Sequence, residues 1–144
     1  MKLIARFATL AFTIGCSSTP SASQLAVADF GPGLDQSSAE QRASAWLSEN
    51  IDNPEMAEIK FSEVRDGYIR NKFAQGNNFV YGSRLDASVN AISEGAGFTG
   101  HRPYVFMYYG DHLMGVWGHY RSYHLTGPYD GFRRLEWFGR PDTQ

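Results

Sequence analysis

The chain has 144 residues, of which 42% are hydrophobic and 19% are charged, and its formal net charge is −2. This length and composition predict one folded domain and exclude a second core of ordinary size. The slightly negative charge argues against broad nucleic-acid binding, and the single cysteine excludes a disulfide within the chain.

Residues 1–15 have the composition of an export signal. Lys2 and Arg6 provide a positive start, and the apolar run behind them is too short to cross a bilayer, for which about 20 residues are needed. The run ends in Gly15-Cys16, and a small residue directly before a cysteine resembles the lipobox of bacterial lipoproteins. We therefore expect a signal peptide over 1–15, lipidation of Cys16 and attachment to a membrane through that lipid.

The chain behind the cysteine is polar at first. Residues 16–34 start with small polar side chains that have nothing to bury, which predicts a lipidated cysteine followed by a flexible tether. Ser17 resembles the signal for outer-membrane sorting, so we expect a single domain over 35–144 in the cell envelope, facing the periplasm. Ordinary secretion with cleavage after Ala28 is the alternative, although that site lies far beyond the apolar run.

A helix is expected to begin near Ser38. Ser37 and Glu40 have the spacing of a capping box, and Asp52-Asn53-Pro54 should end the helix. Apolar residues at helical spacing predict one buried stripe. The stripe consists of Ala39, Ala43, Trp46, Leu47 and Ile51.

Two segments behind the helix predict a first β-hairpin. Residues 59–64 largely alternate between apolar and polar side chains, and residues 68–73 read as a second strand. Between them lies Asp66-Gly67, a dipeptide typical of tight hairpin turns. We therefore expect these two strands to pair with each other.

A long strand and a second hairpin follow. Residues 79–90 largely alternate between apolar and polar or small side chains, which predicts a long strand with one buried face. Residues 104–109 and 113–117 flank Gly110-Asp111 and predict the second hairpin. The expected fold is α+β, with one N-terminal helix packed on a four- to five-stranded antiparallel sheet in two layers.

The loop between the long strand and the second hairpin carries a resemblance. Val89-Asn90-Ala91 and Gly97-Phe98-Thr99-Gly100, followed by a hydrophobic strand, resemble a family of small, functionally uncharacterised exported bacterial lipoproteins. In that family a helix ending at an acidic-x-Pro sequence precedes the strand, the glycine-rich loop and the hairpin. The resemblance covers residues 38–117. It implies this fold and an envelope location, and it supplies no catalytic residue.

The same loop is the candidate contact for a ligand or partner. Its amides, hydroxyl and guanidinium are groups that bind anions. The alternative is structural, with glycines supplying positive φ and polar side chains satisfying the loop backbone. The candidate residues are Asn90, Gly97, Thr99, Gly100, His101 and Arg102.

Patterns that carry common catalytic chemistries are absent from the sequence. The four histidines lack metal-ligand spacing and no serine lies in a Gly-x-Ser-x-Gly elbow, so we expect no metal, no cofactor and no catalytic nucleophile. Paired carboxylates for glycoside cleavage can come from any part of a fold. Such candidates are Glu63, Asp66, Asp86 and Glu94, which are more often solvated residues.

Aromatic residues concentrate in the last third of the chain. The segment 122–140 combines them with Arg133-Arg134 and is expected to dock as a loop on the sheet, or else to contact a partner. The expected function is that of a non-catalytic envelope lipoprotein that binds a periplasmic protein or peptidoglycan. The alternatives are an enzyme or binder acting on cell-wall polymer and a periplasmic inhibitor of a partner protein.

Overall fold

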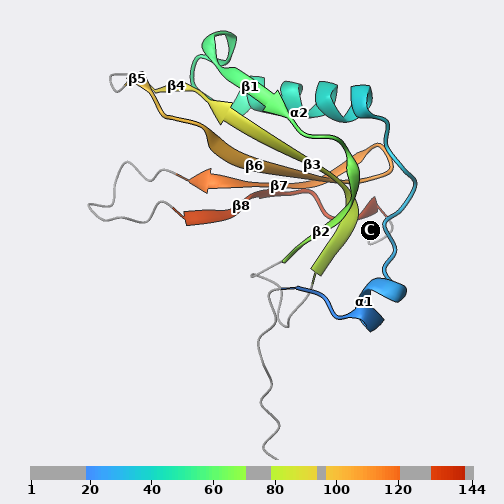
Figure 1. Ribbon diagram of the computed structural model, residues 1–144. Coiled ribbons are helices and arrows are strands. Elements are labelled where there is room, and N and C mark those ends of the chain that lie inside the picture. The colour runs from blue at the N-terminus through green and yellow to red at the C-terminus, as the bar shows by residue number, and fades with distance from the viewer. Residues whose placement is uncertain (1–18, 71–78, 94–96, 121–130, 142–144) are drawn as a thin grey trace, which may run out of the picture.

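The computed structural model describes residues 19–70, 79–93, 97–120 and 131–141 (Figure 1). They form an α+β fold in which helix α2, Gln36–Asn50, covers one face of an antiparallel sheet, as expected. Two short helices accompany it, α1 at Ala22–Ala26 and the 3₁₀ helix η1 at Pro54–Met56. No helix among the described residues is long and apolar enough to span a membrane.

The main sheet has six strands where four or five were expected. The neighbour order is β1-β3-β6-β7-β8, and β2 also pairs with β3. A separate two-stranded sheet, β4 with β5, lies in the excursion between β3 and β6. The bounds of the strands are β1 Glu58–Phe61, β2 Arg65–Arg70, β3 Phe79–Asn90, β4 Ile92–Ser93, β5 Gly97–Phe98, β6 Arg102–Tyr109, β7 His112–Tyr120 and β8 Gly131–Trp137.

The prediction that β1 and β2 form a hairpin is wrong. Both strands run antiparallel to β3 and lie along the same side of it. Asp66 and Gly67 lie inside β2, and a Cβ at Gly67 would come within 2.7 Å of the Arg84 Cβ, so the glycine permits close strand contact. The bend falls between the strands, where Ser62 exchanges hydrogen bonds of 2.9 and 3.0 Å with the Asp86 backbone.

Helix α2 begins two residues earlier than expected. Its N-cap is Asp35, whose carboxylate accepts a hydrogen bond of 3.0 Å from the Ser38 amide. Hydrogen bonds from the Ser38 hydroxyl and amide lower the pKa of Asp35. A charged oxygen is a strong acceptor for the free amides of a first turn, which explains why Asp35 is the cap and Ser37 is not. The helix ends at Asn50, ahead of Pro54, as predicted.

The main core lies between α2 and the sheet. Ala39, Ala43 and Leu47 are fully buried, as the predicted stripe requires, while Trp46 and Ile51 lie at its margin. The stripe packs on apolar residues of β3, β6 and β7. Those residues are Leu85, Ala87, Val89, Phe106, Tyr108 and Val116.

The opposite face of the sheet carries a second apolar cluster, which explains why β6 is apolar at nearly every position. Val105, Met107 and Trp117 alternate with the core residues of their strands and are buried together with Ile69 and Met114. The predicted β6–β7 hairpin is confirmed, with Gly110 at a φ of +58° in its turn. The sheet is therefore apolar on both sides at its centre.

The expected loop over 122–140 is replaced in its second half by strand β8. Residues 131–137 pair antiparallel with β7 and so extend the sheet by one strand. Leu135 packs against the main core, while Arg133-Arg134 interrupts the apolar alternation that would have predicted the strand. Residues 121–130 lie outside the described part of the chain.

Candidate functional site

Residues 21–34 pack against the domain, where a flexible tether was expected; we call them the N-terminal strap. Ser21 and Gln24 form a capping box that starts α1. Further along, the Asp29 carboxylate accepts hydrogen bonds from the Gly31 amide at 2.9 Å and the Tyr109 hydroxyl at 3.0 Å. It also pairs with Arg140. The capping box of α1 and the contacts of the Asp29 carboxylate therefore hold the strap in place, which its composition alone did not indicate.

The Asp29 contacts are electrostatic and mutually reinforcing. The Arg140 guanidinium carbon lies 4.2 Å from the centre of the Tyr109 ring, so the cation stacks on the ring that also donates to Asp29. The hydrogen bond from Gly31, followed by those from Tyr109 and Arg140, lowers the pKa of Asp29. The strap is thereby joined to β6 and to the residues behind β8.

Apolar contacts complete the docking of the strap. The Phe30 ring meets Tyr81 edge to face, with ring centres 5.7 Å apart. Gly31 has a φ of +73° and lies under the Tyr109 ring, where a Cβ would come within 2.5 Å of a ring carbon. Only glycine fits this conformation at this distance.

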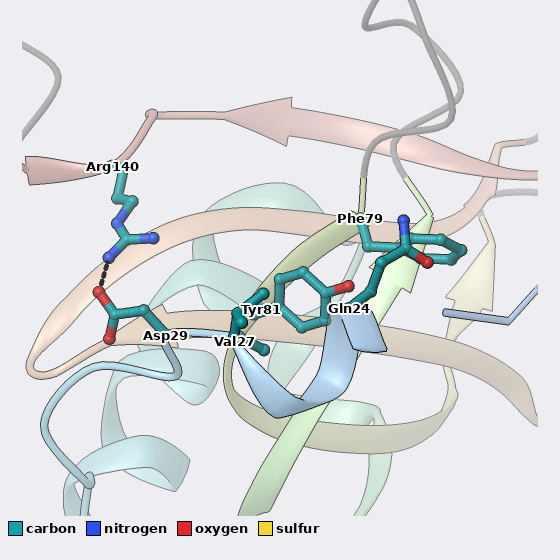
Figure 2. Close-up of a pocket in the computed structure, with 7 residues that line it drawn as sticks. Gln24, Val27, Asp29, Phe79, Tyr81 and Arg140 are labelled. Atoms are coloured by element: carbon teal, nitrogen blue, oxygen red, sulfur yellow. Dashed lines mark hydrogen bonds and ion pairs between the residues drawn. The ribbon is translucent and has the colours of Figure 1, made fainter. Parts of the chain in front are cut away.

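A pocket of about 360 Å³ opens between the strap, the start of β3 and Arg140. Figure 2 shows Val27 and Tyr81 at its centre, the Asp29–Arg140 ion pair at one end and Gln24 beside Phe79 at the other. Among the described residues that line it, Asp29 is the only acidic one, and its oxygens already bind Gly31, Tyr109 and Arg140. The pocket therefore offers apolar and aromatic contact, without a carboxylate pair for hydrolysis.

A second pocket of about 310 Å³ lies on the other side of α1. Leu25 and Phe30 line it from the strap, and Arg65, Tyr68 and Arg84 are among its residues from the sheet. Neighbouring Asp86, one of the candidate carboxylates, lies 3.2 Å from Arg65 and 2.7 Å from Arg84. Its charge is neutralised by two guanidinium groups, which suits a structural ion pair.

The predicted contact loop is organised by its own backbone. Thr99 exchanges hydrogen bonds with the Ala91 backbone, at 2.8 Å through its amide and 3.3 Å through its hydroxyl. Gly97 and Gly100 have φ of +72° and +76°. These features match the structural alternative for Gly97, Thr99 and Gly100.

His101 and its neighbours form a separate surface cluster. The His101 Nδ1 lies 3.1 Å from the Ser88 hydroxyl, and Nε2 lies 3.4 Å from Glu58, which pairs with Lys60 at 3.5 Å. A carboxylate at this position disfavours an anion site. Sequence reasoning missed Glu58, Lys60 and Ser88 because only strand pairing brings them beside His101.

The remaining predicted residues are not gathered into a site. Asn90 ends β3, and its side-chain oxygen is buried without a hydrogen bond among the described residues. Arg102 begins β6 opposite Val89. Glu63 is exposed, and Cys16 and Glu94 lie outside the described residues. Metal-binding groups of three or more His, Cys, Asp or Glu do not occur in the described part of the chain.

Strand β8 presents an aromatic surface to solvent. Phe132 and Trp137 of β8 and Phe138, which directly follows the strand, are exposed at 38%, 38% and 45%, and we call these three residues the β8 surface. The Trp137 ring packs edge to face on buried Trp117 with ring centres 6.0 Å apart, and the Arg134 guanidinium lies 5.5 Å from its ring centre. Trp137 is therefore held in a fixed orientation while remaining accessible.

The strand that carries this surface is an edge strand. β8 is the last strand in the sheet order, and within the described ranges no strand pairs with its outer side. Two bonds fix it on its inner side: the Phe138 amide donates to the Met114 carbonyl at 2.8 Å, and the Trp46 indole donates to Glu136 at 2.5 Å. Among the described residues, β8 is therefore an edge strand that is held firmly to the rest of the domain.

No protein-family model, curated protein or solved structure matches the chain. The resemblance to exported lipoproteins through residues 89–91 and 97–100 therefore stays a prediction. What the protein does has to be inferred from its own residues.

Proposed function

We propose that this protein is a non-catalytic lipoprotein of the cell envelope, anchored through Cys16, that binds a partner protein through the β8 surface. The observation that carries the proposal is the exposure of two large rings on an edge strand of the described sheet and of a third ring directly after that strand. Rings of this kind beside an arginine are the residues that dominate protein interfaces. The lipobox-like sequence before Cys16 supports the location.

The edge strand suggests how the partner docks. An extended segment of a partner can add to a sheet by pairing along its edge strand, and side-chain pockets add specificity. Trp137 and Phe138 stand at the end of β8, where such a segment would place apolar side chains against them. Main-chain pairing with an aromatic contact at one end is the proposed binding mode.

One observation favours peptidoglycan as a second candidate. The Trp137 ring is exposed and oriented by Trp117, which resembles the arrangement in which an indole stacks on a sugar ring. Sugar stacking needs the ring face but does not need the strand edge. The two candidates therefore differ in the part of β8 that they use.

A capture experiment from envelope extract tests the proposal. The lipidated chain is compared with Trp137→Ala/Phe138→Ala and with Phe98→Ala, which removes a ring that is 62% exposed at the distant β5. We expect the unmodified chain and Phe98→Ala each to capture one protein in stoichiometric amount. The double variant should bind that protein with an affinity lower by about 30-fold or more. Equal capture by all three contradicts the proposal, and purified peptidoglycan retained without a protein favours the second candidate.

A further inference from the structure

The strap exposes apolar side chains. Leu25 lies within α1 and is 40% exposed. Val27 directly follows the helix and is 83% exposed. The sequence from residue 17 to residue 28 contains no charged residue, and the first charge after Cys16 is Asp29. An uncharged segment with protruding apolar side chains has no electrostatic barrier to approaching lipid.

Aromatic rings surround these side chains. Tyr68, Phe79 and Tyr81 form a cluster with ring centres 5.7 to 6.5 Å apart, and Phe30 joins it through Tyr81. All four rings are half-buried. Tyr68 belongs to β2, and Phe79 and Tyr81 belong to the start of β3, and these strand segments lie at the end of the sheet near α1 (Figure 1). Rings with a polar tip are typical of the boundary between lipid and water.

The length of chain between Cys16 and the strap limits where the domain lies. Ser21, the N-cap of α1, follows Cys16 by five positions, and a fully extended chain spans at most about 17 Å over that length. The strap is fixed to the sheet through Asp29 and Phe30. A lipid on Cys16 therefore keeps α1 close to the bilayer for as long as the strap is docked.

We infer that the α1 end of the domain rests on the lipid bilayer, with Leu25 and Val27 as the contact and the ring cluster around them at the lipid–water boundary. This inference rests on the proposed lipid anchor and adds an orientation to it. The β4–β5 hairpin lies at the other end of β3 (Figure 1), whose twelve residues span about 36 Å, so it faces away from the membrane.

A single new cysteine tests the orientation in the full lipidated chain. The native chain has one cysteine, whose sulfur the lipid occupies, so Val27→Cys or Phe98→Cys supplies the only free thiol for an environment-sensitive fluorophore. Both positions are exposed, at 83% and 62%, which makes Phe98→Cys a matched control at the distal end. The labelled proteins are reconstituted in phosphatidylethanolamine and phosphatidylglycerol vesicles.

The inference predicts that the fluorophore at residue 27 shifts to shorter wavelength, is quenched by brominated lipid and is shielded from iodide, while the fluorophore at residue 98 keeps its aqueous behaviour. Equal iodide quenching at both positions in protein that floats with the vesicles overturns the orientation and leaves the anchor intact. Protein that neither floats nor carries fatty acid by mass measurement overturns the anchor and the orientation together.

Discussion

The Tyr109 hydroxyl donates a hydrogen bond of 3.0 Å to the Asp29 carboxylate, which joins the end of β6 to a residue 80 positions earlier in the chain. Arg140 contacts both partners, through the ion pair to Asp29 and through the Tyr109 ring. The N-terminal strap and the C-terminal residues are thus held at one point. The stability of the strap should depend on the charge of one exposed carboxylate.

The attachment of the strap should weaken in acid. Hydrogen bonds to Asp29, first from Gly31, hold its pKa below the ordinary value of 3.8, so the contribution to stability is present above that value and is lost as pH falls through the lowered pKa. Amide hydrogen exchange at Gly31 and Phe30 should therefore quicken in this window beyond its intrinsic pH dependence. In Asp29→Asn the exchange should be fast at every pH; slow exchange in that variant would falsify this role.

The bond between α2 and β8 should be measurable in the unfolding free energy. Trp46→Phe keeps an aromatic ring beside Phe106 and removes the indole N–H that donates to Glu136 at 2.5 Å. We expect a loss of about 1.5 kcal/mol in denaturant unfolding, because the lost bond is to a charged group that is only half-buried. Glu136→Gln retains an acceptor oxygen and should cost less; the reverse order argues against a charge-assisted bond.

Gly82 should tolerate no side chain. A Cβ at this position would lie 2.2 Å from the Tyr108 carbonyl oxygen, which is backbone and cannot turn aside. Gly82→Ala must therefore push β3 and β6 apart and should lower the unfolding free energy by about 1–3 kcal/mol or more. Gly33→Ala is the control, since a methyl group there would meet no atom within 4 Å, and it should leave the thermal midpoint almost unchanged.

Substitutions of two leucines should distinguish a core position from a surface position by their effect on the unfolding free energy. Leu47 is fully buried, whereas Leu25 is 40% exposed. Leu47→Ala should cost about 2–5 kcal/mol because it leaves a cavity between α2 and the sheet, and Leu25→Ala should change the unfolding free energy by about 0.5 kcal/mol or less. Similar losses for both would mean that Leu25 belongs to the core.

The proposed lipid anchor predicts a clear phenotype for substitution of Cys16. Cys16→Ala should abolish fatty-acid labelling and membrane association without changing the circular dichroism or the thermal midpoint of the domain. The reason is that Cys16 precedes every element that builds the core. Unchanged labelling in the variant would contradict lipidation.

The parts of the fold that the sequence predicts are those with strong local signals. Helix α2, strand β3 and the β6–β7 hairpin each follow one regular spacing of apolar residues or a clear turn. The pairing of β1 and β2 with β3 was not predicted, because Asp66-Gly67 has the sequence of a turn and its real role depends on Arg84 across the strands. Strand β8 was missed for a similar reason. Its own sequence does not alternate regularly, and it forms a strand because it pairs with β7.

The candidate sites were less predictable than the fold. The glycine-rich loop was predicted as a contact for a ligand or partner. In the structure, however, Thr99 and the Ala91 backbone satisfy each other's hydrogen-bonding groups. The density of aromatics did point to the C-terminal third, but exposure depends on which strand face each ring occupies, and only the register with β7 decides that. The docking of the strap could not be predicted because its partner Arg140 lies 111 positions from Asp29.

The order of the strands bears on how the protein would fold during the export proposed above. Each strand of the main sheet from β3 onward pairs with the strand of that sheet before it. In the proposed export, the sheet would therefore grow in the order in which its strands emerge from the membrane. The strap differs, because its ion pair from Asp29 to Arg140 can form only after β8, the strand before Arg140, has also emerged. The strap, next to the proposed anchor, would therefore emerge before the sheet and be fixed in place only after the sheet has formed.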